Sequence, residues 1–413
     1  MKKNIRVAAL VMSIFLVVTL LAACGDKADQ DGPKGASQNN EPKELTVWTH
    51  LTEKSEYPVV KKIAEEWAEK TGNKVKVVYD QSSFQAYSQA AASSKGPDIM
   101  FGMPHNDLGV FQRANLLEEV PSDVIDKSKY VDVAIDAVTH NGKIYALPLA
   151  MDSMALFYNP EKVTTPPATF EEFIEQAKKV GFMYHFPDLF SSYPFIAGSG
   201  AYVFKNNSGT LDVNDIGLGN EGAVKGYALI RSFIKEHNFF KADCTGDIAN
   251  GNFKAGKIGF FLGGPWDVDG FRKANVKFAV TPLPKMDGKI MPTFVSLQAA
   301  FVSAKSKNKE TAWELMKYMA ENSPVPLFKS GNRIPVLKAE LEKPEVKGDK
   351  IISAFAEQAS NGNPIPNIPE MNAAWDPVKN NILLVVSDKS TPEKAGVDVV
   401  TQIKQGISTL QSK

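Results

Sequence analysis

The sequence lacks the features of several common protein classes. It has two cysteines in 413 residues, too few for a disulfide scaffold or a four-cysteine zinc site. It also lacks a charge excess, because 47 basic side chains balance 47 acidic ones, whereas nucleic-acid-binding proteins normally carry a basic surplus. The apolar fraction of 43% is ordinary for a chain that buries a large core. We therefore expect a globular protein that binds no nucleic acid.

Catalytic and metal-binding motifs are missing or incomplete. The five histidines are scattered without His-x-x-x-His spacing, and no Gly-x-Ser-x-Gly elbow occurs. Gly251–Lys257 has the spacing of a phosphate loop, but Ile258 stands where Ser or Thr should hold magnesium, and a helical stretch precedes the loop. We expect no metal, no cofactor and no enzymatic activity. A glycosidase with two acids across a cleft is an alternative, weakly supported because 47 acidic residues always offer such pairs.

The N-terminus has the layout of a secretory signal peptide. Two lysines and an arginine precede an apolar run over residues 7–23, shorter than the about 20 residues of a transmembrane helix. The run ends in Leu-Ala-Ala-Cys24, which is similar to the bacterial lipoprotein signal, whose cysteine is lipidated and becomes the new N-terminus. We expect removal of residues 1–23 and a lipid on Cys24, with an uncleaved anchor helix as the alternative. The remaining chain is slightly acidic, and Cys244 is then a lone, buried or half-buried thiol.

Residues 24–43 are predicted to form a lipidated, flexible tether. The stretch is rich in Asp, Lys, Gln, Asn, Gly and Ser and has almost no apolar side chains, so it cannot bury enough surface to fold. We expect it to hold a folded body close to the membrane.

From Glu44 onward, strand-like and helical segments alternate. Leu45–Thr49 and Lys74–Tyr79 are rich in β-formers, and between them Val59–Lys70 has apolar residues at helical spacing before Gly72. Thr169 and Glu172 form a capping box that should open another helix. Such alternation predicts an α/β protein with mainly parallel sheets.

Short segments along the whole body resemble the extracytoplasmic sugar-binding proteins of ABC importers, closest to the maltose/maltodextrin-binding type. Each segment is weak alone, but their order and spacing make the match specific. They are Leu45–Trp48, Glu69–Gly72, Lys74–Val77, Gly96–Phe101, Asn141–Pro148, Leu156–Asn159, Phe253–Lys257, Gly264–Trp266, Pro366–Met371 and Trp375.

The resemblance implies a two-lobed, type II periplasmic-binding-protein-like α/β fold, with a cleft between the lobes and hinge crossovers. It places the N-terminal lobe at 44–150 plus 300–350 and the C-terminal lobe at 151–299 plus 351–413. It implies a monomeric receptor, lipid-anchored on the extracytoplasmic face of the cell membrane. This receptor would bind maltodextrins in the cleft, close by hinge motion and deliver the sugar to the permease subunits of an ABC importer.

The five tryptophans differ in their sequence context. Trp67 and Trp313 occupy apolar positions of amphipathic helices, and Trp48 ends a strand, so we expect these three in the core. Trp266 follows Gly-Gly-Pro directly after a strand, and Trp375 lies in a segment rich in turn residues. The resemblance places both at positions that stack on sugar rings, whose C–H faces pack on flat aromatic side chains.

Polar ligand residues are assigned through the resemblance. It gives sugar contacts to Asp152, where the family has a longer glutamate, and to Asp188 with Phe190, which keeps a family ring but loses its hydroxyl. Tyr202 and Ile365 are weaker candidates that more often pack than bind. The remaining assigned positions are Glu53, Asn106, Asp107 and Lys379.

Several of these positions depart from the family pattern. Thr52-Glu53 replaces an aspartate–lysine pair, Asn106-Asp107 replaces an aspartate–arginine pair, and Lys379 replaces an arginine. Gly102 and Met103 stand where a tryptophan is expected. The second lobe thus keeps its aromatic platform while the polar groups of the first lobe change. This pattern leaves open a different oligosaccharide, such as a cyclodextrin or a galacto-oligosaccharide.

Overall fold

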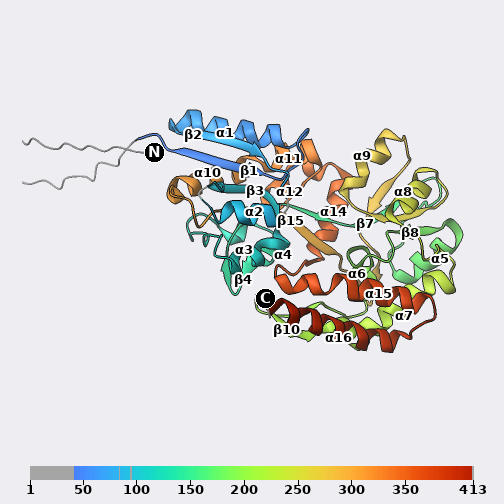
Figure 1. Ribbon diagram of the computed structural model, residues 1–413. Coiled ribbons are helices and arrows are strands. Elements are labelled where there is room, and N and C mark those ends of the chain that lie inside the picture. Colours follow the sequence, from blue (N-terminus) through green and yellow to red (C-terminus); the bar gives the residue numbers. More distant parts are fainter. Residues whose placement is uncertain (1–40, 83, 94, 412–413) are drawn as a thin grey trace, which may run out of the picture. The chain divides into compact units, whose positions relative to one another are not determined.

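The computed structural model describes residues 41–82, 84–93 and 95–411, and the folded body begins at Pro42 (Figure 1). The predicted signal peptide, Cys24 and the tether up to residue 40 lie outside the described residues. Among the described helices, none is both long and apolar enough to span a bilayer.

A mixed seven-stranded sheet forms one half of the body, so the prediction of mainly parallel sheets is wrong. β1 is parallel to both β2 and β3, whereas β15 is antiparallel to β3 and to β6. β17 (Asn363–Pro364) pairs with the start of β15. In order across the sheet, the other strands are β16 (Ile334–Pro335), β6 (Leu147–Ser153), β15 (Phe294–Val302), β3 (Ile99–Pro104), β1 (Glu44–Thr49) and β2 (Lys74–Tyr79).

Helix α1 (Tyr57–Thr71) joins β1 to β2 and confirms the predicted helix. One face of α1 is apolar and buried, and Gly72 ends the helix at φ 73°, a left-handed conformation that glycine adopts without penalty. Helix α10 (Lys309–Asn322) packs beside α1. Trp67 on α1 and Trp313 on α10 are 4% and 6% exposed, which confirms that both belong to the core.

A four-stranded sheet forms the other half. Its order is β12 (Ala279–Thr281), β7 (Ala155–Tyr158), β11 (Phe260–Gly263) and β8 (Phe182–Tyr184). Met154 alone separates β6 of the large sheet from β7 of the small sheet, and the chain returns between β12 and β15. Helix α14 (Lys350–Ser360) contacts strands of both sheets, β6 and β16 as well as β7 and β12. The two sheets are therefore joined by at least two chain crossings and one shared helix.

Helices α6 (Leu189–Ala197), α7 (Glu221–Lys235), α15 (Trp375–Val386) and α16 (Pro392–Gln411) pack together beside the small sheet (Figure 1). Helix α5 (Phe170–Val180) begins with the predicted capping box: Glu172 N donates to Thr169 Oγ1 at 3.2 Å, and Thr169 N donates to Glu172 Oε2 at 3.4 Å. Helices α8 (Gly246–Lys254) and α9 (Pro265–Lys273) flank β11.

The remaining elements are short. The β9–β10 hairpin (Phe204–Asn207 and Thr210–Ile216) matters for the cavities described below. The others are α2 (Phe84–Ala91), α3 (Leu108–Arg113), α4 (Asp132–Val138), α11 (Pro324–Gly331), α12 (Lys338–Leu341), α13 (Pro344–Lys347), β4 (Thr139–His140), β5 (Lys143–Ile144), β13 (Lys285–Met286), β14 (Lys289–Ile290), η1 (His105–Asp107), η2 (Lys127–Lys129), η3 (Gly217–Gly219) and η4 (Pro369–Ala373).

The small sheet is stabilised by phenylalanine packing around Phe157 on β7. This side chain is fully buried, and its ring centroid lies 5.3–6.3 Å from those of five other phenylalanines. We expect Phe157→Ala to lower the free energy of unfolding by about 3–5 kcal/mol, because it opens a cavity in packed surroundings. Urea unfolding measures this loss. Phe157→Leu is the control and should cost less than half as much; equal costs would contradict the packing argument.

Candidate functional site

A cavity of about 590 Å³ opens beside the small sheet, where strand ends meet helix N-termini. β8 and β11 are parallel, so their carboxyl ends lie at one edge, and helices α6, α8 and α9 begin there. We call this cavity the Trp266 pocket; it is lined by Met154, His185, Asp188, Phe190, Ser191, Thr245, Gly246, Asp247, Asn250, Lys254, Phe261, Leu262, Gly263, Trp266 and Asp267.

Trp266 is the exposed aromatic side chain of this pocket, at 56% of its full surface. A Cβ atom on Gly264 would lie 2.3 Å from the indole ring, so the ring occupies space that only glycine leaves free. Asp267 fixes the turn, because it accepts hydrogen bonds from Gly264 N at 3.1 Å and from Asn250 Nδ2 at 2.7 Å. Burial raises the pKa of Asp267, partly offset by these hydrogen bonds. The result is a flat apolar ring held in place but open to solvent.

Aromatic rings continue from Trp266 in a row. Ring centroids lie 6.3 Å apart for Trp266 and Phe190, 6.1 Å for Phe190 and Phe294, and 6.1 Å for Phe294 and Trp375. We call these four residues the aromatic row. Three of them were predicted as ligand residues from the sequence. Phe294 was missed, because it begins an apolar strand and is only 1% exposed, which gives it the sequence signature of an ordinary core residue.

Asp188 positions Phe190. It is the N-cap of α6, and its carboxylate accepts hydrogen bonds from Ser191 N at 3.1 Å and Ser191 Oγ at 3.3 Å. Both Asp188 and Phe190 line the Trp266 pocket. The structure thus brings together three of the predicted site residues, Asp188, Phe190 and Trp266, in one cavity.

Asp152 belongs to a buried ionic triad that the sequence did not reveal. Arg333 Nη1 donates to Asp152 Oδ2 at 2.7 Å, and Arg333 Nε donates to Glu56 Oε1 at 2.6 Å. Thr52 N also donates to Glu56 Oε2 at 2.8 Å. Arg333 is 181 residues from Asp152 and 277 from Glu56, so no local sequence pattern links them. We call Glu56, Asp152 and Arg333 the ionic triad.

The pKa values of the two carboxyl groups of the triad are shifted in opposite directions. Burial would raise the pKa of Glu56, but hydrogen bonds and charge from Arg333, together with the Thr52 N–H, lower it below its ordinary value. Burial dominates at Asp152 and raises its pKa despite Arg333, with Glu56 adding to the rise. One cation therefore serves two buried acids, and the group carries a net negative charge when both are ionised.

The other predicted site residues lie apart from the Trp266 pocket. Asn106 and Asp107 lie in η1 after β3, where Asn106 Nδ2 donates to Asp107 Oδ2 at 3.2 Å and burial raises the pKa of Asp107 to about 6. Glu53 is exposed in the turn before α1, and Lys379 is exposed on α15, one turn after Trp375. None of these four lines the pocket, and neither do Asp152 and Trp375.

The chemistry of the pocket suits a neutral, polyhydroxylated ligand. An exposed ring can pack on C–H faces, while carboxylate, amide, hydroxyl and ammonium groups around it offer both donors and acceptors. Across residues 41–411 as described, no cluster of three His, Cys, Asp or Glu side chains is placed to hold a metal ion. Gly251–Lys257 closes helix α8 ahead of strand β11, the reverse of the order in a phosphate loop.

Comparison with known proteins gives a consistent result. The family model for bacterial extracellular solute-binding proteins matches residues 62–354. The galactooligosaccharide-binding protein of Bacillus subtilis (strain 168) is 32% identical, with 91% of each chain covered. The maltooligosaccharide ABC transporter solute-binding lipoprotein of Streptococcus pneumoniae (strain ATCC BAA-255 / R6) is 29% identical, with 98% of each chain covered.

Solved structures with the same fold include two maltodextrin-binding proteins. That of Alicyclobacillus acidocaldarius is 37% identical with a TM-score of 0.77, covering 87% of this chain and 100% of the other. A cyclo/maltodextrin-binding protein complexed with maltotetraose is 34% identical with a TM-score of 0.83, covering 90% and 99%. The two-lobed solute-binding fold predicted from the sequence is thereby confirmed.

The ionic triad predicts a pH-dependent stability defect. Arg333→Leu should lower the free energy of unfolding by about 3–5 kcal/mol at pH 7, because it leaves two buried carboxylates without their cation. Without Arg333, the pKa values of both acids should lie above their unfolded values, so the folded variant binds more protons. The difference in the free energy of unfolding between wild type and Arg333→Leu should therefore become smaller as the pH falls towards about 5.

Urea unfolding at pH 8 and pH 5 measures both effects. Arg272→Leu is the control. Arg272 is half-exposed, and its guanidinium lies 3.7 Å from Asp349 and 3.9 Å from Asp269, so its removal should cost less than about 1 kcal/mol. An Arg333→Leu deficit that is equally large at both pH values would show that packing, not charge, explains the loss.

Proposed function

Because the chain belongs to the family of bacterial extracellular solute-binding proteins, we propose that it is the receptor of an ABC importer and that its ligands are maltodextrins. The observation that carries this proposal is the exposed Trp266 ring in a pocket lined by acids and amides. The names of relatives and structural neighbours support the same ligand class, since several are described as binding maltooligosaccharides or maltodextrins.

Binding requires no covalent step. Successive sugar rings would pack their C–H faces along Trp266 and the exposed edges of Phe190 and Trp375, while Asp188 accepts hydrogen bonds from hydroxyl groups. We assign Asp152, Glu53, Asn106, Asp107 and Lys379 to polar contacts made when the two lobes approach each other. One lobe would be built on the large sheet and the other on the small sheet. The chain crosses between the two sheets at Met154 and again between β12 and β15. Closure around the sugar would present the loaded receptor to the permease subunits.

A galactooligosaccharide is the second candidate ligand. It is favoured by the name of a relative that is 32% identical over 91% of this chain. Calorimetric titration with a maltooligosaccharide series, a cyclodextrin and a galactooligosaccharide separates the candidates. The maltodextrin assignment predicts dissociation constants in the micromolar range or lower, about −8 kcal/mol or better. Heat only with galactooligosaccharide would transfer the assignment to that ligand.

Removal of the exposed ring tests the site. Trp266→Ala should weaken binding of maltotetraose by about 1.5–3 kcal/mol, tenfold or more in dissociation constant, because the sugar loses its apolar platform. Since Trp266 is 56% exposed, the urea unfolding midpoint should hardly change. Trp266→Phe is the matched control and should retain part of the affinity. Wild-type affinity in Trp266→Ala would contradict the proposed site.

The proposed receptor function also predicts that bound oligosaccharide stays intact. Prolonged incubation with maltoheptaose should leave its chain length unchanged when analysed by chromatography. Shortened products that disappear in Asp152→Asn would instead identify a glycosidase.

Lipidation of Cys24 is the proposed means of anchoring the receptor to the outer face of the cell membrane. It is supported by the Leu-Ala-Ala-Cys24 signal and by a relative described as a lipoprotein. Cells expressing the chain should incorporate labelled palmitate into it, and Cys24→Ala should abolish the label. Cys244→Ala is the control and should keep it, because the Cys244 side chain is buried. Equal labelling of the Cys24→Ala variant would contradict this anchor.

A further inference from the structure

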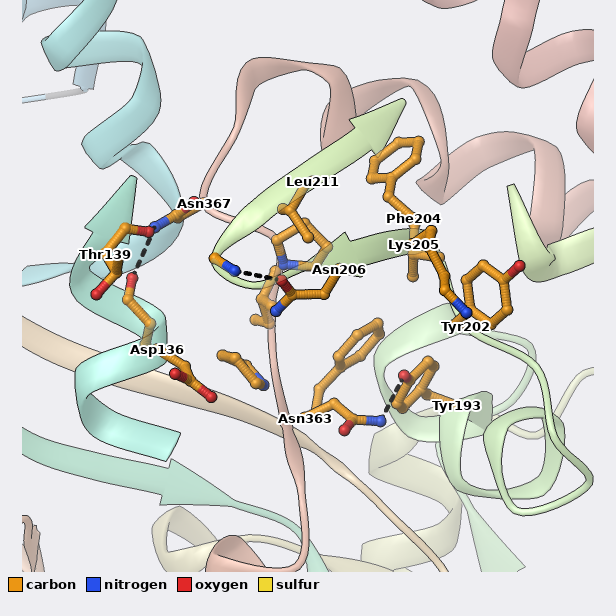
Figure 2. A pocket seen from close by; sticks show the side chains of 17 residues that line it. Asp136, Thr139, Tyr193, Tyr202, Phe204, Lys205, Asn206, Leu211, Asn363 and Asn367 are labelled. Atoms are coloured by element: carbon orange, nitrogen blue, oxygen red, sulfur yellow. Dashed lines mark hydrogen bonds between the residues drawn. The ribbon is translucent and has the colours of Figure 1, made fainter. Parts of the chain in front are cut away.

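A second cavity, of about 310 Å³, lies between helix α4, the β9–β10 hairpin and residues 363–367 (Figure 2). We call it the hairpin cavity. Figure 2 shows Asp136 and Thr139 on one side, Leu211 and Asn206 on the hairpin, and Tyr193 and Tyr202 on the other side. A Cβ atom on Gly209 would lie 3.5 Å from Thr139 Cγ2, so the hairpin turn touches β4. The cavity therefore lies between an element packed on the large sheet and one that belongs to the small-sheet half.

The hairpin cavity is distinct from the Trp266 pocket. The two share no lining residue. Stacked rings separate them: Tyr193 and Phe294 have centroids 3.6 Å apart and planes within 10°, and Phe294 stacks on Phe190, which lines the Trp266 pocket. A ligand in one cavity is thus screened from the other by aromatic side chains.

The cavity is lined by aromatic rings, aliphatic side chains and hydrogen-bonding groups. Phe204 and Leu211 supply apolar walls, and Tyr202 adds a half-buried ring. Asn363 Nδ2 donates to Tyr193 Oη at 2.9 Å, which leaves Asn363 Oδ1 free to accept a hydrogen bond. Asn206 Oδ1 accepts from Gly209 N at 2.7 Å, which leaves Asn206 Nδ2 free to donate.

Asp136 adds an acceptor without a partner. Across the described part of the chain, its carboxylate makes no hydrogen bond and no ion pair. Desolvation raises the pKa of Asp136, and the neighbouring Asp132 adds to this rise. Lys205, whose Nζ lies 5.5 Å from the centroid of the Tyr202 ring, brings a single positive charge to the same cavity. The two opposite charges make the cavity close to neutral while it remains rich in donors and acceptors.

From this geometry we propose that the hairpin cavity is a second binding site, for a single neutral polyhydroxylated ring such as a monosaccharide. Its volume is at the lower end of the range for small-molecule pockets, about 300–1,000 Å³, which suits one ring and excludes a long oligosaccharide. Near-neutral charge disfavours phosphorylated or strongly ionic compounds. The aromatic walls suit C–H faces, and Asp136, Asn206 and Asn363 suit hydroxyl groups. This site goes beyond the proposed oligosaccharide function and does not depend on it.

D-glucose is the probe for this site. Its binding to the purified protein is measured by saturation-transfer NMR and by titration. The titration extends to about 50 mM, because a one-ring ligand is expected to bind in the millimolar range. Leu211→Trp should fill the cavity and lower bound glucose at least about tenfold. Thr210→Trp is the matched control and should bind normally, because neighbouring residues of a strand point to opposite faces and Thr210 is exposed. All glucose measurements use the Trp266→Ala background, so that glucose bound at the Trp266 pocket does not contribute to the signal.

The pattern across the variants decides the outcome. In the Trp266→Ala background, absence of glucose binding, or glucose binding that survives Leu211→Trp, would overturn the second site. If Leu211→Trp fails to fold, Asp136→Asn is compared with Asp132→Asn on the same helix. Weaker glucose binding in Asp136→Asn alone supports the site. Equal glucose binding by both variants opposes it. Failure of maltodextrin titrations leaves this comparison unaffected.

Discussion

The antiparallel pairing of β6 and β15 is the constraint on which the rest of the structure depends. These two strands lie side by side in the large sheet, with Asp152 opposite Ser296 and Ser153 opposite Val295, and each continues towards the small sheet. The hydroxyls of Ser153 and Thr293 are 2.6 Å apart at the point of exit. Because a one-residue slip would turn every side chain to the opposite face, this register fixes which residues reach the region between the sheets. Asp152, Met154 and Phe294 all owe their positions to it.

Several buried polar side chains near this crossing have hydrogen-bond partners on distant segments. His105 accepts a hydrogen bond from Leu297 N on β15 at its Nδ1, 3.1 Å away, and its Nε2 lies 2.9 Å from Ile365 O. Burial lowers the pKa of His105 to about 4, so the ring is neutral and links β15 to the segment that follows β17. The ionic triad similarly links the turn before α1 to β6 and to Arg333, which directly precedes β16. Replacing either group would leave unpaired polar atoms in a dry environment, so both specify how distant segments meet.

Local signals explain what could be predicted from the sequence. The helix ending at Gly72, the capping box at Thr169 and the core positions of Trp67 and Trp313 depend on residues within a few positions of each other, and the structure confirms them. The exposed Trp266 was also marked locally, by the glycines and proline before it. The pairing of Glu56 with Arg333 and the lining of the hairpin cavity each depend on segments far apart in the chain, so no spacing or periodicity could predict them.

The rings of the aromatic row differ in how far they are exposed to solvent. Trp266 is more than half exposed and contributes little to the core, whereas Phe294 is 1% exposed and stacks on Tyr193 as well as Phe190. The row therefore includes one ring open to solvent, Trp266, and one ring fixed by packing, Phe294. Sequence change at Trp266 should cost little folding energy, whereas change at Phe294 would disturb the wall of the hairpin cavity and the packing of Phe190 beside it. The fold therefore depends on Phe294 far more than on Trp266.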